Sequence, residues 1–139
     1  MRLLDTNVIL YAAGRDHRYK EPCARILQEV AEGSTLYAID TELLQEVLYV
    51  YASRGERARG LATFDYLLAL FPNPFPVSRE EMAMARRLLG LDSVLSPRDA
   101  IHAAVVQTQM LEGIITSDRA FREIPGLAVF DPLDLASGR

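Results

Sequence analysis

Short apolar runs alternate along this chain with longer segments of helical periodicity, and this alternation restricts the fold more than any other feature. Strands are predicted at residues 3–4, 36–39, 75–77, 113–116 and 128–130. Helices are predicted over residues 5–11, 21–33, 40–55, 56–70, 78–90 and 96–112. Strands that alternate with helices favour a parallel α/β sheet with helices on both faces.

Length and composition are those of one globular domain, which we expect to span residues 1–139. Half of the residues are hydrophobic, enough to build a core. Cys23 is the only cysteine, so no internal disulfide can form and a reducing, cytoplasmic setting is expected. Asp5 interrupts the first apolar run, so no signal peptide is predicted. No apolar stretch is long enough to cross a bilayer, and no membrane partner is expected.

Four acidic residues are predicted to meet at one edge of the sheet. Asp5 directly follows the first strand, and Asp118 follows the strand at 113–116. Asp99 lies in the first turn of a helix, and Glu46 lies one turn into the helix after the second strand. In open parallel sheets, ligands bind beyond the carboxyl ends of the strands. We therefore expect these four side chains to converge there.

Convergence of four carboxylates needs a physical reason. Two carboxylates about 4 Å apart repel by about 4 kcal/mol at an effective dielectric constant of 20. Protons or cations must relieve this repulsion, and a site made of oxygen ligands selects Mg²⁺ or Mn²⁺. Such ions can polarise a phosphodiester and activate water, so no nucleophilic side chain is required.

The same four segments resemble those of a known family. Residues 3–7 (LLDTN), 41–47 (TELLQEV), 99–104 (DAIHAA) and 115–121 (ITSDRAF) resemble the four acidic segments of PIN domains, in order and along the whole chain. The most similar group is the VapC-type toxins of toxin–antitoxin pairs. The resemblance implies a five-stranded parallel sheet, Mg²⁺-dependent endoribonuclease activity with Asp5, Glu46, Asp99 and Asp118 as catalytic and metal-binding residues, and an antitoxin partner.

Each acid also has a local structural interpretation. Asp5 could cap a helix, Asp99 could complete a capping box with Ser96, and Asp118 could begin a turn. Glu46 could be a solvated helix residue, although it lies at the edge of an apolar helix face. Any one of these interpretations is reasonable, but all four together, in this order, are much less expected.

Other polar residues near these positions are assigned supporting or structural roles. Three could bind a phosphate or a metal-bound water, or could make ordinary capping and turn bonds: Thr6, Asn7 and Thr116. His102 is interpreted as a packing or supporting residue, Glu42 as solvent-exposed, and Asp40 as a helix cap.

Four cationic residues are predicted to contact an RNA backbone at the rim of the site: Arg15, Arg18, Lys20 and Arg119. The alternative is that they are ordinary surface charges. The net charge of −4 is unusual for a nucleic-acid enzyme. Setting aside the four site carboxylates leaves equal numbers of acidic and basic residues, so the overall charge neither indicates nor excludes RNA.

The two predicted helices over 40–55 and 56–70 carry more apolar residues than one sheet face can cover. Their tyrosines and phenylalanines are typical of an interface core. We therefore predict an antitoxin bound to this surface and self-association as a homodimer. The alternative is that the two helices pack only on each other.

Two other functions fit part of the pattern. In an aspartate-nucleophile phosphatase Asp5 would attack phosphorus, but Asn7 stands where such sites resemble Asp-x-Asp, and Lys20 comes too early to be the required lysine. A PIN-like module that binds RNA or protein without cleaving it would have no need to retain four mutually repelling acids.

Overall fold

The centre of the protein is a parallel sheet with strand order β2-β1-β3-β4. In the computed structural model, which describes residues 1–91 and 94–136, β1 (Arg2–Leu4) pairs with β2 (Tyr37–Ala38) and with β3 (Gly113–Ile115). Strand β4 (Val129–Phe130) pairs with the other edge of β3. The register aligns Leu4 with Ile115, so the chain leaves β1 and β3 at the same level.

The predicted fifth strand at 75–77 is wrong as a strand, because the described residues form only one isolated bridge there, between Asp40 and Phe75. The Phe75 amide donates to the Ile39 carbonyl, and the Thr41 amide donates to the Phe75 carbonyl. Helix α3 begins at Thr41, so the pairing partner then turns away and the Val77 amide bonds to the Thr41 hydroxyl instead. The sheet of the described residues therefore has four strands.

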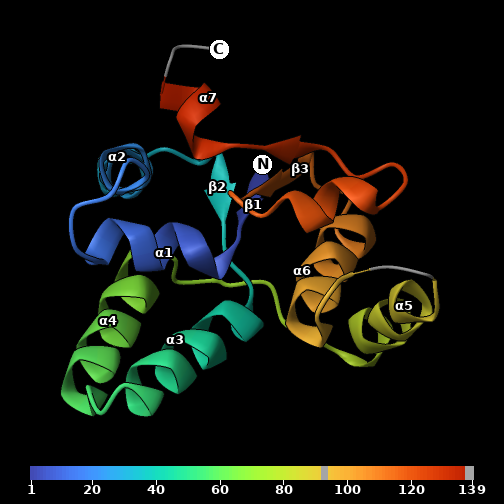
Figure 1. Ribbon diagram of the computed structural model, residues 1–139, viewed down its shortest axis with the longest axis horizontal. Helices are drawn as coiled ribbons and strands as arrows, with labels where there is room; N and C mark the ends of the chain where they lie inside the picture. Colours follow the sequence, from blue (N-terminus) through green and yellow to red (C-terminus); the bar gives the residue numbers. More distant parts are fainter. Residues whose placement is uncertain (92–93, 137–139) are drawn as a thin grey trace.

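Alternating side chains of the central strands enter two separate cores, as strand geometry requires. Leu3 and Ile114 pack with α5 (Arg79–Gly90) and α6 (Pro97–Thr108). Leu4 and Ile115 pack with α1 (Thr6–Ala13) and α2 (Lys20–Ala31). These two helix pairs lie on opposite sides of the sheet (Figure 1), so the predicted α/β arrangement with helices on both faces is confirmed.

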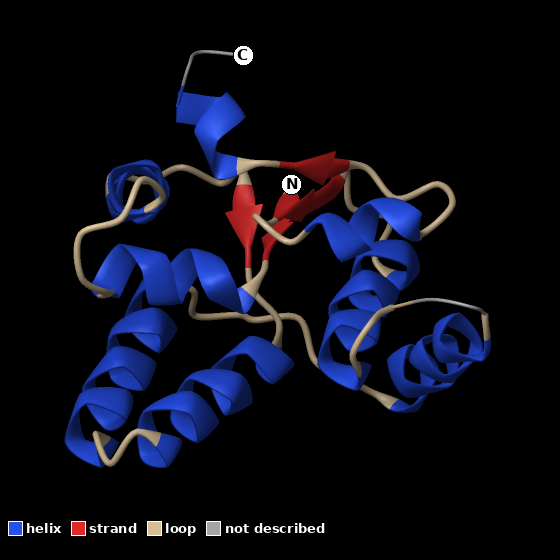
Figure 2. Cartoon of the chain, viewed as in Figure 1, coloured by secondary structure: helices blue, strands red, loops and turns tan. Residues whose placement is uncertain are grey.

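Helices α3 (Thr41–Ser53) and α4 (Arg57–Leu70) form a hairpin that extends away from the sheet (Figures 1 and 2). Gly60 permits the close packing, because a Cβ at this position would lie 2.8 Å from Cβ of Tyr51. The outer surfaces of the hairpin leave four large apolar side chains more than a third exposed: Tyr49, Leu61, Tyr66 and Leu68. Packing of the two helices on each other therefore does not cover their apolar surface.

The chain ends with a 3₁₀ helix, η1 (Arg119–Glu123), then β4 and a short helix, α7 (Pro132–Ala136). Helix α7 was not predicted, because five residues after a strand carry too little periodicity. Residues 92–93 and 137–139 of the predicted domain lie outside the described residues. Within the part of the chain that the structure describes, no helix combines the length and apolar character needed to span a membrane.

Candidate active site

Asp5 lies at the centre of the site, directly after β1. One carboxylate oxygen accepts a hydrogen bond from the Thr6 amide at 2.7 Å, and the other accepts from the Thr116 hydroxyl at 2.7 Å. Only 5% of the residue is exposed. Because both oxygens are held, Asp5 caps α1 and also presents a fixed, buried negative charge at the carboxyl edge of the sheet.

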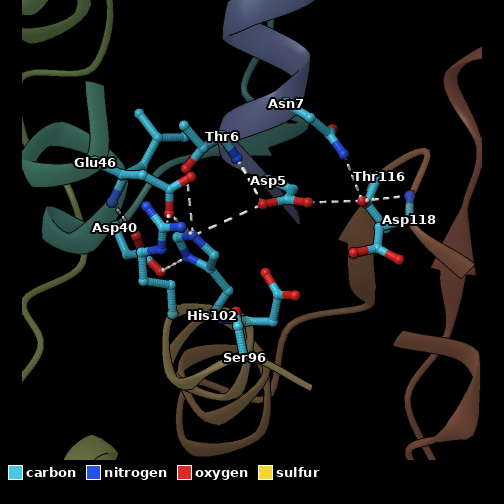
Figure 3. A network of polar contacts seen from close by, with 12 residues as sticks. Asp5, Thr6, Asn7, Asp40, Glu46, Ser96, His102, Thr116 and Asp118 are labelled. Carbon is cyan, nitrogen blue, oxygen red and sulfur yellow. Dashed lines mark hydrogen bonds and ion pairs between the residues drawn. The ribbon is translucent and has the colours of Figure 1, made fainter. Parts of the chain in front are cut away.

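Thr116 joins the ends of β1 and β3. Its hydroxyl donates to Asp5 and accepts from the Asn7 side-chain amide at 3.1 Å and from the Asp118 backbone amide at 2.9 Å. Asn7 also donates to the Ser117 hydroxyl at 3.1 Å. Figure 3 shows this chain of contacts running from Asp5 to Asp118. The predicted supporting residues Asn7 and Thr116 therefore fix the positions of two of the four acids.

Asp99 and Asp118 face the same space as Asp5. Asp99 enters from the first turn of α6, whose Ser96 cap accepts a hydrogen bond from the Asp99 amide. Asp118 caps η1 by accepting from the Ala120 amide at 2.9 Å. Burial, followed by the negative charges of Asp5 and Asp118, raises the pKa of Asp99 from 3.8 to about 6. The three aspartates therefore lie close enough to repel one another.

Glu46 completes the group from α3, on the other side of Asp5. Its side chain is 14% exposed and lies 3.6 Å from the Arg98 guanidinium and 3.9 Å from Nε2 of His102. Burial raises the pKa of Glu46, the neighbouring His102 and Arg98 oppose this, and Asp5 adds to it. The structure thus brings together all four predicted acids, here called the acidic cluster: Asp5, Glu46, Asp99 and Asp118.

A buried His102–Asp40 pair supports the cluster; the sequence analysis assigned His102 a packing or supporting role but did not predict its pairing with Asp40. Nδ1 of His102 lies 2.7 Å from Oδ2 of Asp40, and both side chains are fully buried. Nε2 of His102 faces Asp5 Oδ1 at 3.8 Å and the Thr6 hydroxyl at 3.4 Å. Burial alone would lower the pKa of His102, but the charges of Asp40, Asp5 and Glu46 together raise it to about 9. The imidazolium is a built-in positive charge beside the acids.

Asp40 is also the helix cap that the sequence predicted, because its Oδ1 accepts a hydrogen bond from the Leu43 amide. The position of Asp40 in the sequence could have shown that it lies near the site. Asp40 follows β2, the neighbour of β1, so the argument that placed Asp5 at the carboxyl edge applies to it equally. Glu42 was expected to be solvent-exposed, but it is partly buried. Burial raises the pKa of Glu42, His102 lowers it, and the charges of Asp40 and Glu46 raise it.

The cluster can be compared with the needs of a hard cation. All four acids offer carboxylate oxygens, and Oδ1 of Asn7 is a buried oxygen for which the described residues provide no hydrogen-bond partner. Within residues 1–91 and 94–136, which the structure describes, no three His, Cys, Asp or Glu side chains lie close enough together to bind one metal ion by themselves. Mg²⁺ needs no such set, because it keeps several waters and binds one or two carboxylates directly. The donor chemistry therefore fits Mg²⁺ or Mn²⁺.

The four predicted RNA-contacting cations are distributed unequally. Arg15 lines a groove of about 900 Å³ whose lining also includes Asn7. Arg18 lies over the ring of Tyr19, and Lys20 begins α2 with its side chain partly buried. Arg119 is exposed in η1, next to Asp118. Arg15 therefore shares a groove with Asn7 of the site. Arg18, Lys20 and Arg119 do not line this groove.

A parallel sheet covered by helices on both faces, with acids at its carboxyl edge, is the architecture of a PIN domain. Residues 2–127 match the PIN domain family, so the chain belongs to this family. Ribonuclease VapC13 of Mycobacterium tuberculosis is 30% identical over 127 residues, which cover 91% of this chain and 97% of that protein.

Solved structures share the same fold. A chain of the toxin–antitoxin complex from Klebsiella pneumoniae is 25% identical, with a TM-score of 0.66 and coverage of 95% of this chain and 98% of that one. A chain in the structure of VapBC2 from Rickettsia felis, bound to a DNA fragment from its promoter, has a TM-score of 0.71 at 18% identity, covering 94% and 97%. At that identity the likeness shows the fold alone.

Proposed function

We propose that this protein is a Mg²⁺- or Mn²⁺-dependent endoribonuclease and the toxin of a VapBC-type toxin–antitoxin pair. The observation that carries the proposal is the acidic cluster, in which acids from four separate segments lie together and the pKa values of Asp5, Glu46 and Asp99 are raised, by burial first and then by neighbouring acids. A fold has no structural need for such repulsion, whereas a cation that binds a phosphodiester gives it a use. The similarity to ribonucleases named VapC supports the choice of RNA as substrate.

The reaction is hydrolysis: a water oxygen bonds to phosphorus, the bond to the leaving sugar oxygen breaks, and that oxygen takes a proton. A bound divalent cation would supply Lewis-acid polarisation of the phosphodiester and would lower the pKa of the water. Asp5, held by Thr6 and Thr116, and Asp99 would hold the cation. Glu46 and Asp118 flank them from α3 and η1, where each can orient water or accept a proton.

The two alternative functions are less well supported. In a phosphatase Asp5 would be the nucleophile, but the second position of the Asp-x-Asp pattern is Asn7, whose side-chain amide is bonded to the Thr116 and Ser117 hydroxyls. A PIN module that binds without cleaving would retain the same fold. Activity therefore has to be measured directly.

The test is incubation of the purified protein with mixed cellular RNA, with and without Mg²⁺. We expect fragments only when the cation is present, loss of cleavage with a chelator, and recovery on addition of Mg²⁺ or Mn²⁺. Cleavage that continues in excess chelator would contradict metal dependence. Intact RNA under every metal condition, with the folded protein still binding RNA, would favour the non-cleaving module.

The proposed antitoxin partner has an apolar surface available. A groove of about 540 Å³ between α1, α2 and α4 is lined mainly by Ala, Leu, Ile and Tyr side chains, including Ile9, Leu27 and Tyr66. The hairpin of α3 and α4 adds the exposed Tyr49 and Leu61. Co-expression with the neighbouring open reading frame should yield a stable complex and relieve toxicity. A protein that is harmless alone and purifies without a partner would contradict the toxin assignment but not the nuclease site.

The same hairpin supports the proposed homodimer, because it exposes the apolar side chains of Tyr49, Leu61, Tyr66 and Leu68, and tyrosine is enriched at protein interfaces. Light scattering in dilute solution should give a mass near twice 15.5 kDa. A strictly monomeric mass would contradict self-association. We place the pair in the cytoplasm, where an RNA-cleaving toxin meets its substrate.

A further inference from the structure

The groove that Asn7 helps to line runs along one face of α1 and is here called the α1 groove. It has a volume of about 900 Å³, and the residues that line it include Asn7, Tyr11, Arg15, His17, Arg54 and Arg59. Among its lining residues, Asn7 and Gly14 are seven residues apart on or beside α1, which is about 10 Å at the rise of an α-helix. This length and volume suit a small organic ligand such as one or two nucleotides.

One wall of the α1 groove carries a stack of aromatic rings. The rings of Tyr11 and His17 lie 4.9 Å apart at 19°, and those of Tyr11 and Tyr19 lie 5.0 Å apart at 24°. The buried Tyr19 anchors the stack, because its hydroxyl donates to Asp131 at 2.8 Å. Its backbone amide donates to Nδ1 of His17 at 3.2 Å and so fixes the imidazole. His17 is therefore an exposed ring held in place before any ligand arrives.

Three arginines among the lining residues supply positive charge. Arg59 is already occupied, since it pairs with Glu56 at 3.2 Å and donates to the Ala13 carbonyl. For Arg15 and Arg54 the described residues provide no carboxylate within salt-bridge distance. The groove also contains Asp16, but its arginines outnumber its two carboxylates in a protein whose net charge is −4. Guanidinium groups beside an exposed ring are the pattern that binds single-stranded nucleic acid.

We propose that the α1 groove binds the nucleotide next to the scissile phosphate, with its base against His17 and its backbone phosphate near Arg15 and Arg54. This subsite rests on the proposed ribonuclease function, because Asn7 belongs both to the acidic site and to the groove. An RNA strand whose phosphodiester lies at the acidic cluster can pass Asn7 and enter the groove directly. A single-stranded segment is required, since its base must be free to stack.

Two measurements separate the subsite from the catalytic site. Affinity is measured by fluorescence anisotropy with a 5′-labelled single-stranded RNA of mixed sequence in chelator. Chemistry is measured with bis(p-nitrophenyl) phosphate and Mn²⁺, a small phosphodiester that has no neighbouring nucleotide. We expect His17→Ala to weaken RNA binding at least about fivefold, and His17→Phe, which keeps a ring, to remain within about twofold of the wild type. Neither variant should alter hydrolysis of the small phosphodiester.

The contribution of positive charge in the groove is tested with the double variant Arg15→Gln/Arg54→Gln. Its matched control is Arg57→Gln/Arg79→Gln, two exposed arginines outside the groove. The groove variant should reduce the slope of log affinity against log salt by about 1.4, at about 0.7 per phosphate contact, and the control should leave it unchanged.

Unchanged RNA affinity in both groove variants would overturn the subsite, even if the wild type cleaves RNA. An effect confined to complex formation with the co-expressed antitoxin would also overturn it and make the groove a protein-binding surface. A wild-type protein that hydrolyses neither substrate, but loses RNA affinity through the groove variants, would contradict the proposed ribonuclease function and retain the nucleotide subsite.

Discussion

The acidic cluster and the α1 groove meet at Asn7, but their charges are held in opposite ways. In the cluster, hydrogen bonds through Thr6 and Thr116 hold Asp5 and connect it to Asp118, and the buried His102 lies beside Asp5 and Glu46. In the groove, Arg15 and Arg54 lie at an open surface beside an exposed ring. The acids of the cluster therefore repel one another, and a bound cation can relieve this repulsion. The arginines of the groove are available to a ligand and cost the fold little stability. The cluster is suited to cation-assisted cleavage, and the groove is suited to binding a nucleic-acid strand.

The largest effect should come from Asp99→Asn in the acidic cluster. Asparagine keeps the shape of the side chain but loses the charge that would hold a cation. Loss of residues that merely support metal ligands costs 10–100-fold, so we expect cleavage of RNA to fall by more than about 100-fold. Binding of labelled RNA should persist, because the groove is untouched. Wild-type cleavage by this variant would reduce Asp99 to a structural residue of α6.

The buried His102–Asp40 pair should give the largest effect on stability. Asp40→Ala removes the partner of a buried imidazolium and the cap of α3, and breaking a buried ion pair costs about 3–5 kcal/mol. Asp40→Asn retains an oxygen for the Leu43 amide and should lose less. Denaturant unfolding of both variants in chelator measures this difference. Equal, small losses would show that His102 does not need the charge of Asp40.

How far the sequence predicted these two regions depends on the range of the interactions. Asp5, Asp118 and Glu46 could be placed because each follows a strand whose end is set by parallel topology. The residues around Phe75 do not themselves reveal that no strand forms there. Pairing stops after one bridge because the partner segment turns into α3 at Thr41. His102 and Asp40 are 62 residues apart, and neither flanking pattern reveals the other. The groove likewise combines Tyr11 with Arg54 from another helix end.

A smaller effect of opposite sign should separate stability from activity in the acidic cluster. In metal-free protein the pKa of Asp99 is raised from 3.8 to about 6, so its ionisation opposes folding. The folded state holds its proton more tightly, and stability falls as pH rises from about 4 to 6 and stays lower above that. Asp99→Asn should therefore be more stable than the wild type at pH 7 in chelator, by an amount on the order of 1 kcal/mol after solvent screening.

This difference should disappear near pH 3, below the pKa of Asp99 in both states, where its carboxyl is largely protonated whether the chain is folded or unfolded. Thermal unfolding at pH 3 and pH 7 gives the comparison, with chelator present throughout. Added Mg²⁺ should stabilise the wild type more than the variant. A variant that is less stable at both pH values would show that Asp99 contributes more through packing or capping than it costs through repulsion.

The smallest effect is expected in the groove, where no repulsion is stored. Arg15→Gln/Arg54→Gln removes two charges that have no carboxylate partner among the described residues, so its free energy of unfolding should stay within about 0.5 kcal/mol of the wild type. Arg59→Gln is the contrasting variant, because Arg59 pairs with Glu56 and donates to the Ala13 carbonyl, contacts that the described residues give to neither Arg15 nor Arg54. It should be clearly less stable. Equal losses in both would mean that Arg15 and Arg54 also hold the fold, and the groove would then share the structural demands of the cluster.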